Sequence, residues 1–129
     1  MASRRRPATV EDLLSKPART QDVVITVPGE KGDVELLLKL KAISASAYDR
    51  ILAEHPPTKE QSVEGAGYNA DTFAPAIIAA VVTEPEITPE QAGQIWNGDE
   101  WSRGELRDLF MACVNLCAKG LDVPFTFAD

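Results

Sequence analysis

Histidine and cysteine, which most metal sites and many catalytic sites use, are nearly missing from this sequence. The 129 residues contain one histidine, His55, and two cysteines, Cys113 and Cys117. A structural zinc ion takes four such ligands, so these three side chains do not complete a site. A Ser-His-Asp triad would have to use His55, and no serine stands in the setting of a nucleophile elbow. We therefore expect no metal, no cofactor and no enzymatic activity.

Two local patterns look like parts of active sites but lack the surroundings that such sites need. Residues 65–70, GAGYNA, fit the G-x-G-x-x-G/A fingerprint of dinucleotide binding. That fingerprint follows a buried strand, whereas polar KEQSVE precedes these glycines, so we do not expect nucleotide binding. The acidic pairs Glu84/Glu86 and Asp99/Glu100 flank turns, where solvation is the simpler interpretation. Carboxylate catalysis stays open, because distances in the fold cannot be read from a sequence.

Long apolar runs are also missing. The longest one, FAPAIIAAVV, is about half of the ~20 residues that cross a bilayer, and no apolar segment follows the N-terminal arginines as in a secretory signal. We therefore expect no membrane partner. Cys113 and Cys117 stand four apart on a predicted helix, which suits buried thiols better than a disulfide and agrees with a reducing cytoplasm.

Charge of the two signs is unevenly distributed. Residues 1–19 hold five basic and two acidic side chains, whereas residues 20–129 hold eight basic and 18 acidic ones. An acidic body repels phosphate backbones, which makes nucleic acid an unlikely partner of the fold. The arginines Arg4 to Arg6 could still contact nucleic acid or acidic lipid, although a solvated, flexible arm is the simpler interpretation. A small regulator that acts through this arm stays an alternative.

Apolar residues that are present alternate strongly near the N-terminus. In 21–27 and 34–43 they recur at every second position, on either side of the turn-forming PGEKGD, which predicts a β-hairpin. Its apolar face holds Val23, Ile25 and Val27 on one strand and Leu36, Leu38 and Leu40 on the other, with Leu37 as the exception. A two-stranded hairpin is marginal in water, so this face needs a cover.

Helical patterns can supply that cover. Cap residues predict helices that begin after Thr9, Ser44, Asn69 or Asp71, Thr88 and Ser102, the last two with a glutamine or glutamate three residues later. Residues 56–69 read as a polar loop. The segment 71–84 is apolar nearly all round and should be the central helix, provided that Pro75 lies in its first turn. The last helix should run to Lys119 and bury Leu106, Leu109, Phe110, Cys113, Val114 and Cys117.

The predicted architecture is therefore α+β, with an N-terminal β-hairpin packed on a small bundle of about four helices. Residues 1–19 would form a flexible basic arm with a short helix, residues 20–120 a single domain, and residues 121–129 a C-terminal tail. The length suits one core and is too short for two independent ones.

Both tryptophans fall in one turn-rich segment, VVTEPEITPEQAGQIWNGDEW. Asn97-Gly98 predicts a turn between Trp96 and Trp101 that can bring both rings onto one core. We expect packing for this pair, with partner binding as the alternative. Phe125 and Phe127 in the C-terminal tail are further candidates for partner binding, and their alternative is to fold back over the core.

The order of features over residues 20–120 resembles the tail assembly chaperones of long-tailed, siphovirus-type phages of actinobacterial hosts. The pieces that carry the resemblance are YDRILAEHPPTKEQ, GYNADTFAPAIIAAVVTEPEITPEQAGQIW and WSRGELRDLFMACVNLC, together with the hairpin region. The chain is similar to the shorter product of that family, made without the translational frameshift that gives a longer form. The family has no catalytic residues to transfer onto this chain.

The resemblance implies a factor of the host cytoplasm that binds the tape-measure protein and helps tail-tube subunits to assemble, without staying in the virion. Further partners implied are the tail-tube protein and the longer, frameshifted form of the chain itself. A small structural virion protein, either a tail or a head-tail connector subunit, is the alternative. The oligomeric state is not readable from the residues.

Overall fold

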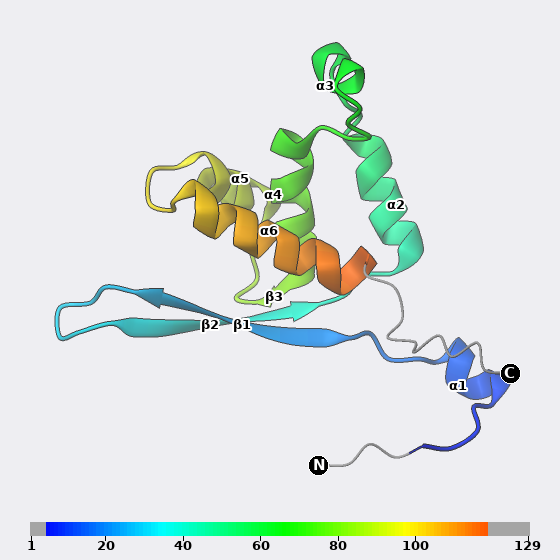
Figure 1. Ribbon diagram of the computed structural model, residues 1–129. Helices are drawn as coiled ribbons and strands as arrows, with labels where there is room; N and C mark the ends of the chain where they lie inside the picture. The colour runs from blue at the N-terminus through cyan, green and yellow to red at the C-terminus, as the bar shows by residue number, and fades with distance from the viewer. Residues whose placement is uncertain (1–4, 119–129) are drawn as a thin grey trace, which may run out of the picture.

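The computed structural model describes residues 5–118 of the chain. Three strands form one antiparallel sheet, with most of the helices on one of its faces (Figure 1). Strands β1 (Thr20–Val27) and β2 (Val34–Lys41) pair in an unbroken register from Thr20↔Lys41 to Val27↔Val34. Strand β3 (Val82–Glu84) pairs with the other side of β2. The α+β class and the hairpin under helices are confirmed, and a third strand is added.

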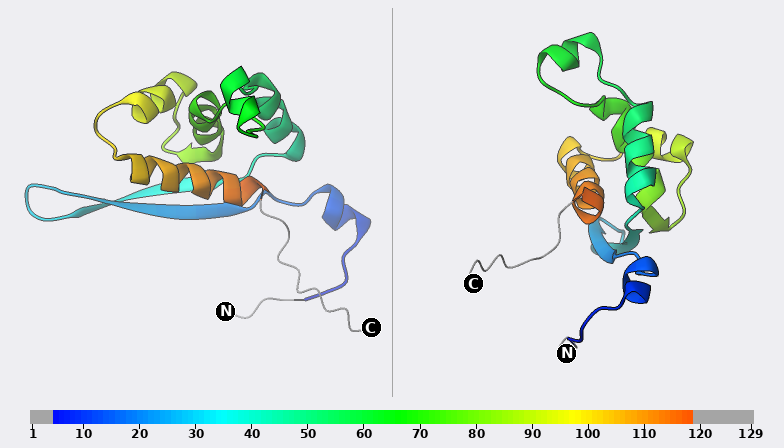
Figure 2. Two further views of the ribbon diagram at one scale, coloured as in Figure 1. Left: turned by 45° about the horizontal axis from the view of Figure 1, so that its top comes forward. Right: turned by 90° about the vertical axis from the view of Figure 1, so that its right-hand side faces the viewer.

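Six helices complete the described part of the chain. Helices α2, α4, α5 and α6 stack on the sheet as one layer, which α3 extends at the top, and α1 lies at the N-terminal end (Figures 1 and 2). Their bounds are α1 Val10–Leu14, α2 Ala45–Glu54, α3 Lys59–Val63, α4 Ala70–Val81, α5 Pro89–Asn97 and α6 Arg103–Ala118. Within residues 5–118 none of these helices has the length and apolar character of a membrane span.

The predicted helix starts are confirmed by hydrogen bonds. Thr88 Oγ1 accepts from the Gln91 N–H at 3.1 Å, and the Gln91 side chain accepts from the Thr88 N–H at 3.0 Å. Ser102 and Glu105 form the same reciprocal pair at the start of α6, at 3.2 and 2.8 Å. Each such pair satisfies backbone N–H groups that a helix start would otherwise leave unpaired.

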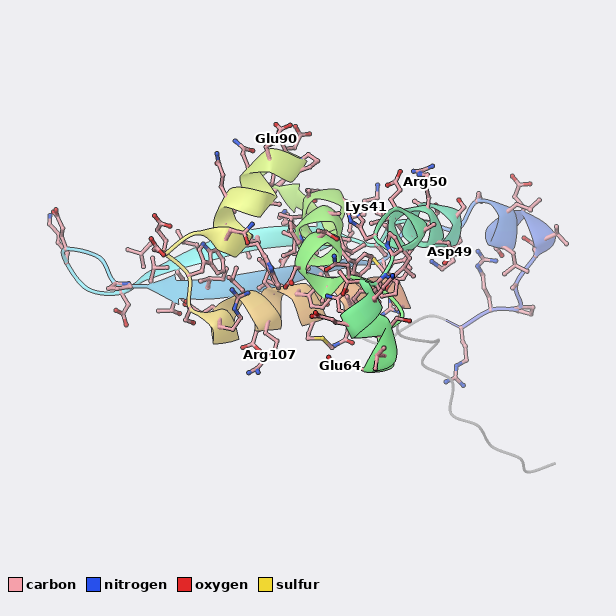
Figure 3. All side chains as sticks on the ribbon, turned by 90° about the horizontal axis from the view of Figure 1, so that it is seen from above. Lys41, Asp49, Arg50, Glu64, Glu90 and Arg107 are labelled. Atoms are coloured by element: carbon pink, nitrogen blue, oxygen red, sulfur yellow. The ribbon has the colours of Figure 1, made fainter. Side chains whose placement is uncertain are left out.

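The core lies between the sheet and the helices, with α4 at its centre. Helix α4 contacts α2, α5 and α6, and its side chains Phe73, Ile77 and Val81 are completely buried. The Phe73 ring meets four neighbouring rings, those of Tyr48, His55, Tyr68 and Phe110. No charged or polar side chain within residues 5–118 is buried. Figure 3 shows labelled charged side chains such as Glu90 and Arg107 pointing away from the body.

Three expectations about this layer were wrong. Residues 56–69 contain helix α3, which a Thr58/Gln61 capping box starts. Helix α4 ends at Val81 rather than Glu84, because the next three residues pair with β2 as β3. Pro75 lies in the second turn of α4. The carbonyl that loses its donor there belongs to Asp71, an exposed residue at the helix start, so water can reach it.

The buried stripe of α6 differs from the predicted one at its end. Leu116 is buried, whereas Val114 and Cys117 are only partly buried. Cys113 is completely buried and unpaired with Cys117, and burial raises the pKa of its thiol to about 12. This thiol therefore stays protonated and inert at neutral pH, which agrees with a core role.

Candidate partner-binding groove

A large apolar hollow lies between the hairpin and α5. It has a volume of about 760 Å³, and we name it the hairpin groove. Its floor comes from the two strands, one wall from the segment before α5, and the other from α5 and the loop that follows. The lining residues are Ile25, Leu36, Leu37, Leu38, Pro85, Glu86, Ile87, Gln91, Gln94, Ile95, Glu100 and Trp101.

The groove exists because the hairpin is longer than the helical layer that covers it. Leu36, Leu38 and Leu40 share one face of β2, because alternate side chains point the same way. Leu40 and Leu38 are 0% and 8% exposed, whereas Leu36 is 48% exposed. The turn end of the hairpin runs out past α5 and α6 (Figures 1 and 2). Apolar side chains of the core-facing side thus continue into solvent.

The two tryptophans have different environments. Trp96 is 7% exposed, and its ring packs edge-on against Phe110 with centroids 6.0 Å apart. The guanidinium carbon of Arg103 lies 5.1 Å from the centroid of the same ring. Trp96 therefore faces the core in this structure rather than a partner. Trp101 is half-buried and lines the hairpin groove, so of the two it is the one that a partner can contact.

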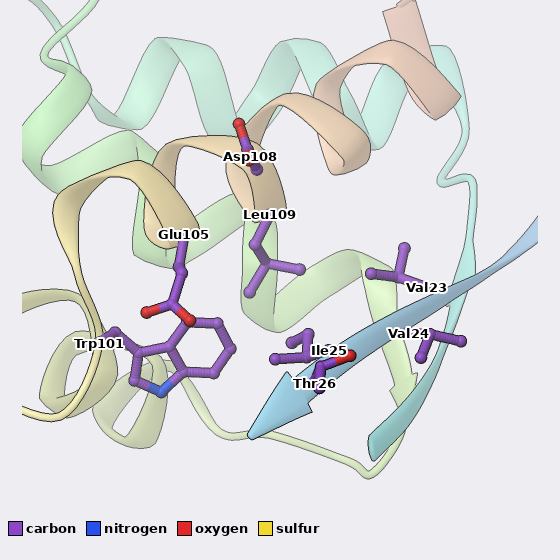
Figure 4. A pocket seen from close by; sticks show the side chains of 8 residues that line it. All are labelled: Val23, Val24, Ile25, Thr26, Trp101, Glu105, Asp108 and Leu109. Carbon is purple, nitrogen blue, oxygen red and sulfur yellow. The ribbon is translucent and has the colours of Figure 1, made fainter. Parts of the chain in front are cut away.

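A smaller hollow adjoins the groove along β1. It has a volume of about 240 Å³, and we name it the edge pocket; Ile25 and Trp101 line both spaces. Figure 4 shows β1 facing α6 across it, with Glu105 beside the Trp101 ring. The residues that line it are Val23, Val24, Ile25, Thr26, Trp101, Glu105, Asp108 and Leu109.

The charges around both spaces have one sign. Glu86 and Glu100 line the hairpin groove, Glu105 and Asp108 line the edge pocket, and no lysine or arginine of the described residues lines either one. Hydrogen bonds from Ser102 lower the pKa of Glu105, because they favour its charged form. Within residues 5–118 one ion pair forms, between Arg6 and Asp12 near α1. It lies far along the chain from the four carboxylates that line the two hollows. An apolar floor with a carboxylate rim fits a partner with apolar and basic side chains.

The other predicted site residues are not among the groove residues that the structure describes. Phe125 and Phe127 lie outside the described residues, as do Arg4 and the end of the predicted last helix. Residues 5–118 hold no group of three or more His, Cys, Asp or Glu side chains that could bind a metal ion. His55 ends α2, where its carbonyl accepts from the Asn69 N–H at 2.9 Å.

Sequence reasoning missed Leu36, Ile87 and Ile95 as groove residues. All three are apolar residues at positions that suit a core, and only the end of the helical layer leaves them accessible. A signal was present in Leu37, which breaks the alternation of β2 and is 53% exposed. A single exposed leucine is common, but Leu37 lies next to Leu36, and a contiguous exposed apolar patch marks a binding surface.

Comparison with known proteins gives no family for this chain. No protein-family model matches it, and no curated protein or solved structure matches it either. The resemblance to phage tail assembly chaperones therefore stays a prediction, and the geometry of the groove has to support any functional proposal.

Proposed function

We propose that this chain is a tail assembly chaperone of a long-tailed phage, in its shorter, unshifted form, which binds the tape-measure protein in the host cytoplasm. The observation that carries the proposal is the hairpin groove, an open apolar surface with a carboxylate rim. The resemblance over residues 20–120 supports the same role. The chain acts by binding and not by catalysis, and it is not retained in the virion.

The groove suits one face of an amphipathic helix. Such a helix presents apolar side chains at i, i+3, i+4 and i+7, and these would lie on Leu36, Ile87, Ile95 and Trp101. Tape-measure proteins are long and helical, with apolar stripes exposed before the tail forms. Covering those stripes keeps the client dispersed, while the net charge of −7 opposes clustering of the complexes. The tail-tube protein and the frameshifted form would bind elsewhere.

A single exposed leucine tests the groove. Leu36→Thr removes apolar area while keeping a residue that favours strands, so the hairpin should persist. We expect a loss of about one kcal/mol or more of client binding, which is about fivefold or more in Kd. The matched control is Val63→Thr on α3, because Val63 is exposed and lies outside both hollows. Co-expression with the tape-measure protein of the same phage and pull-down of the soluble client measure the difference.

Two results would count against this role. Equal client recovery by Leu36→Thr and Val63→Thr would show that the client does not bind in the hairpin groove. Stoichiometric amounts of the chain in purified mature tails would exclude the chaperone role. That result would favour the second candidate, a structural tail or connector subunit. The long hairpin supports that candidate, because ring subunits often join through strands.

A further inference from the structure

Among residues 5–118, nothing pairs with the backbone groups on the outer side of β1, and the hydrogen bonds of the hairpin show which groups these are. Gly29 and Gly32 exchange both backbone bonds, at 3.0 and 3.4 Å, and the Ala42 N–H donates to the Arg19 carbonyl at 2.8 Å. Bonded pairs alternate with unbonded pairs in an antiparallel ladder, so odd-numbered residues of β1 face β2. The even-numbered residues direct N–H and C=O groups outward. They are Thr20, Asp22, Val24 and Thr26.

Among residues 20–27 this edge has one protecting feature, the charge of Asp22, and lacks the others that a strand itself can carry. Natural edge strands carry lysine, proline or a bulge that blocks pairing with another chain. Residues 20–27 contain neither lysine nor proline, and their register with β2 is unbroken over eight residues. Among residues 5–118 no strand pairs with the outer side of β1, and β1 is an edge of the sheet. An open edge of this length is a template for one more strand.

The edge pocket indicates which strand would fit. It lies between this edge and α6, and two carboxylates, those of Glu105 and Asp108, line its α6 side (Figure 4). Neither has a basic group within ion-pair distance in the part of the chain that the structure describes. A strand added to β1 places alternate side chains on the side of the sheet that α6 covers. Basic side chains there would meet both carboxylates.

We propose that the outer edge of β1 binds an extended peptide segment with lysine or arginine at every second position, by strand addition. The backbone bonds hold the segment, and the two carboxylates select its charge. This inference does not rest on the chaperone assignment, because it concerns an extended segment on the edge and not a helix in the hairpin groove. The two sites share Ile25 and Trp101, so occupancy of one would influence the other.

Backbone-modified peptides test the edge without changing the protein. The probe is a capped octapeptide of alternating lysine and threonine, titrated at low salt into the ¹⁵N-labelled full chain. With lysines on the α6 side of an antiparallel strand, the threonine N–H groups point at β1 and the lysine N–H groups point away. N-methylation of the threonines should then weaken binding about tenfold or more, while N-methylation of the lysines should be tolerated. The reverse result would indicate a parallel strand.

Charge and edge variants complete the test. A glutamate-threonine peptide should not bind, and Asp108→Asn should weaken the lysine peptide about threefold. Val24→Pro removes an outward N–H and should abolish binding, whereas Val24→Thr keeps that group and should not. Bound peptide should shift and protect the amides of Asp22, Val24 and Thr26.

Two outcomes would overturn the proposal. Equal affinity of both N-methylated peptides and the parent would show that no backbone pairing occurs. A peptide-free dimer in sedimentation analysis, lost in Val24→Pro, would show that a second copy of the chain occupies the edge instead. Neither outcome decides whether a client binds in the hairpin groove, which Leu36→Thr tests separately.

Discussion

The two halves of the β-hairpin have the same apolar alternation but differ in how deeply their apolar side chains are buried. Near the helices, Leu40 and Leu38 are buried in the core; toward the turn, Leu36 and Val34 on the same face are 48% and 46% exposed. Their sequence context differs little, since all four occupy successive even positions of β2. The difference comes from the helical layer, which ends before the hairpin does (Figure 2).

This contrast shows what a strand pattern can and cannot specify. Alternation determines which side chains share a face, because successive residues point to opposite sides. It does not determine how far along the strand the cover extends, because that depends on the length and placement of helices elsewhere in the chain. The uncovered half therefore becomes a surface that keeps core-like chemistry, and such a surface is suited to binding.

The two tryptophans repeat the contrast and give the largest expected effect. Trp96→Ala should lower the free energy of unfolding by about 3–5 kcal/mol, because it empties a packed site beside Phe110. Trp101→Ala should lower it by about 2 kcal/mol at most, since this ring is already partly exposed. Urea unfolding of both variants measures the difference. Similar losses for the two would mean that Trp101 is also a core residue and that the groove is less open than described.

The next largest expected effect concerns two leucines on the same face of β2. Leu40→Ala should cost about 2–5 kcal/mol of unfolding free energy, as in other fully buried positions. Leu36→Ala should cost less than about 1 kcal/mol, although it removes the same atoms from the same face. Chemical denaturation of the pair, with equal m-values as the control for two-state behaviour, tests this. Equal costs would place a cover over the distal half, supplied by a second copy or by another segment.

Much of the fold could be predicted because local signals and tertiary packing agree. The capping pairs at Thr88 and Ser102 define helix starts by chemistry within four residues, and the hairpin turn lies between two alternating runs. Strand β3 could not be predicted in this way. Its three residues continue an apolar helix in the sequence, and they are a strand only because β2 lies beside them. Thr58 and Gln61 form a capping box that predicts the start of helix α3. The polar composition of residues 56–69 instead suggested a loop.

Much less of the candidate site could be predicted. Trp101 was selected from its type and its position near a turn, and it does line the groove. Leu36 and Ile95 could not be separated from core residues, because exposure depends on where the helical layer stops. Glu86 lines the hairpin groove and Glu105 lines the adjoining edge pocket, and that placement is a property of the fold. A sequence shows that these acids exist but not that they line two adjoining hollows.

The smallest expected effect concerns pH and the rim at the start of α6. Bonds from Ser102 lower the pKa of Glu105, so its charged form stabilises the folded state. That contribution is fully present above the ordinary carboxyl range, and it is lost as the pH falls from about 5 through the lowered pKa of Glu105. Glu105→Gln keeps the capping geometry but cannot titrate. The wild-type protein should therefore be slightly more stable than this variant at pH 7, and the difference should shrink as the pH falls below the ordinary carboxyl range. Urea unfolding of both proteins across this range measures it, and a difference that stays constant with pH would mean that the charge of Glu105 does not contribute. Glu105 also lines the edge pocket. The same Glu105→Gln variant can therefore be used twice: its unfolding reports the role of the charge at the start of α6, and its affinity for the lysine peptide reports the role of the charge toward a basic partner.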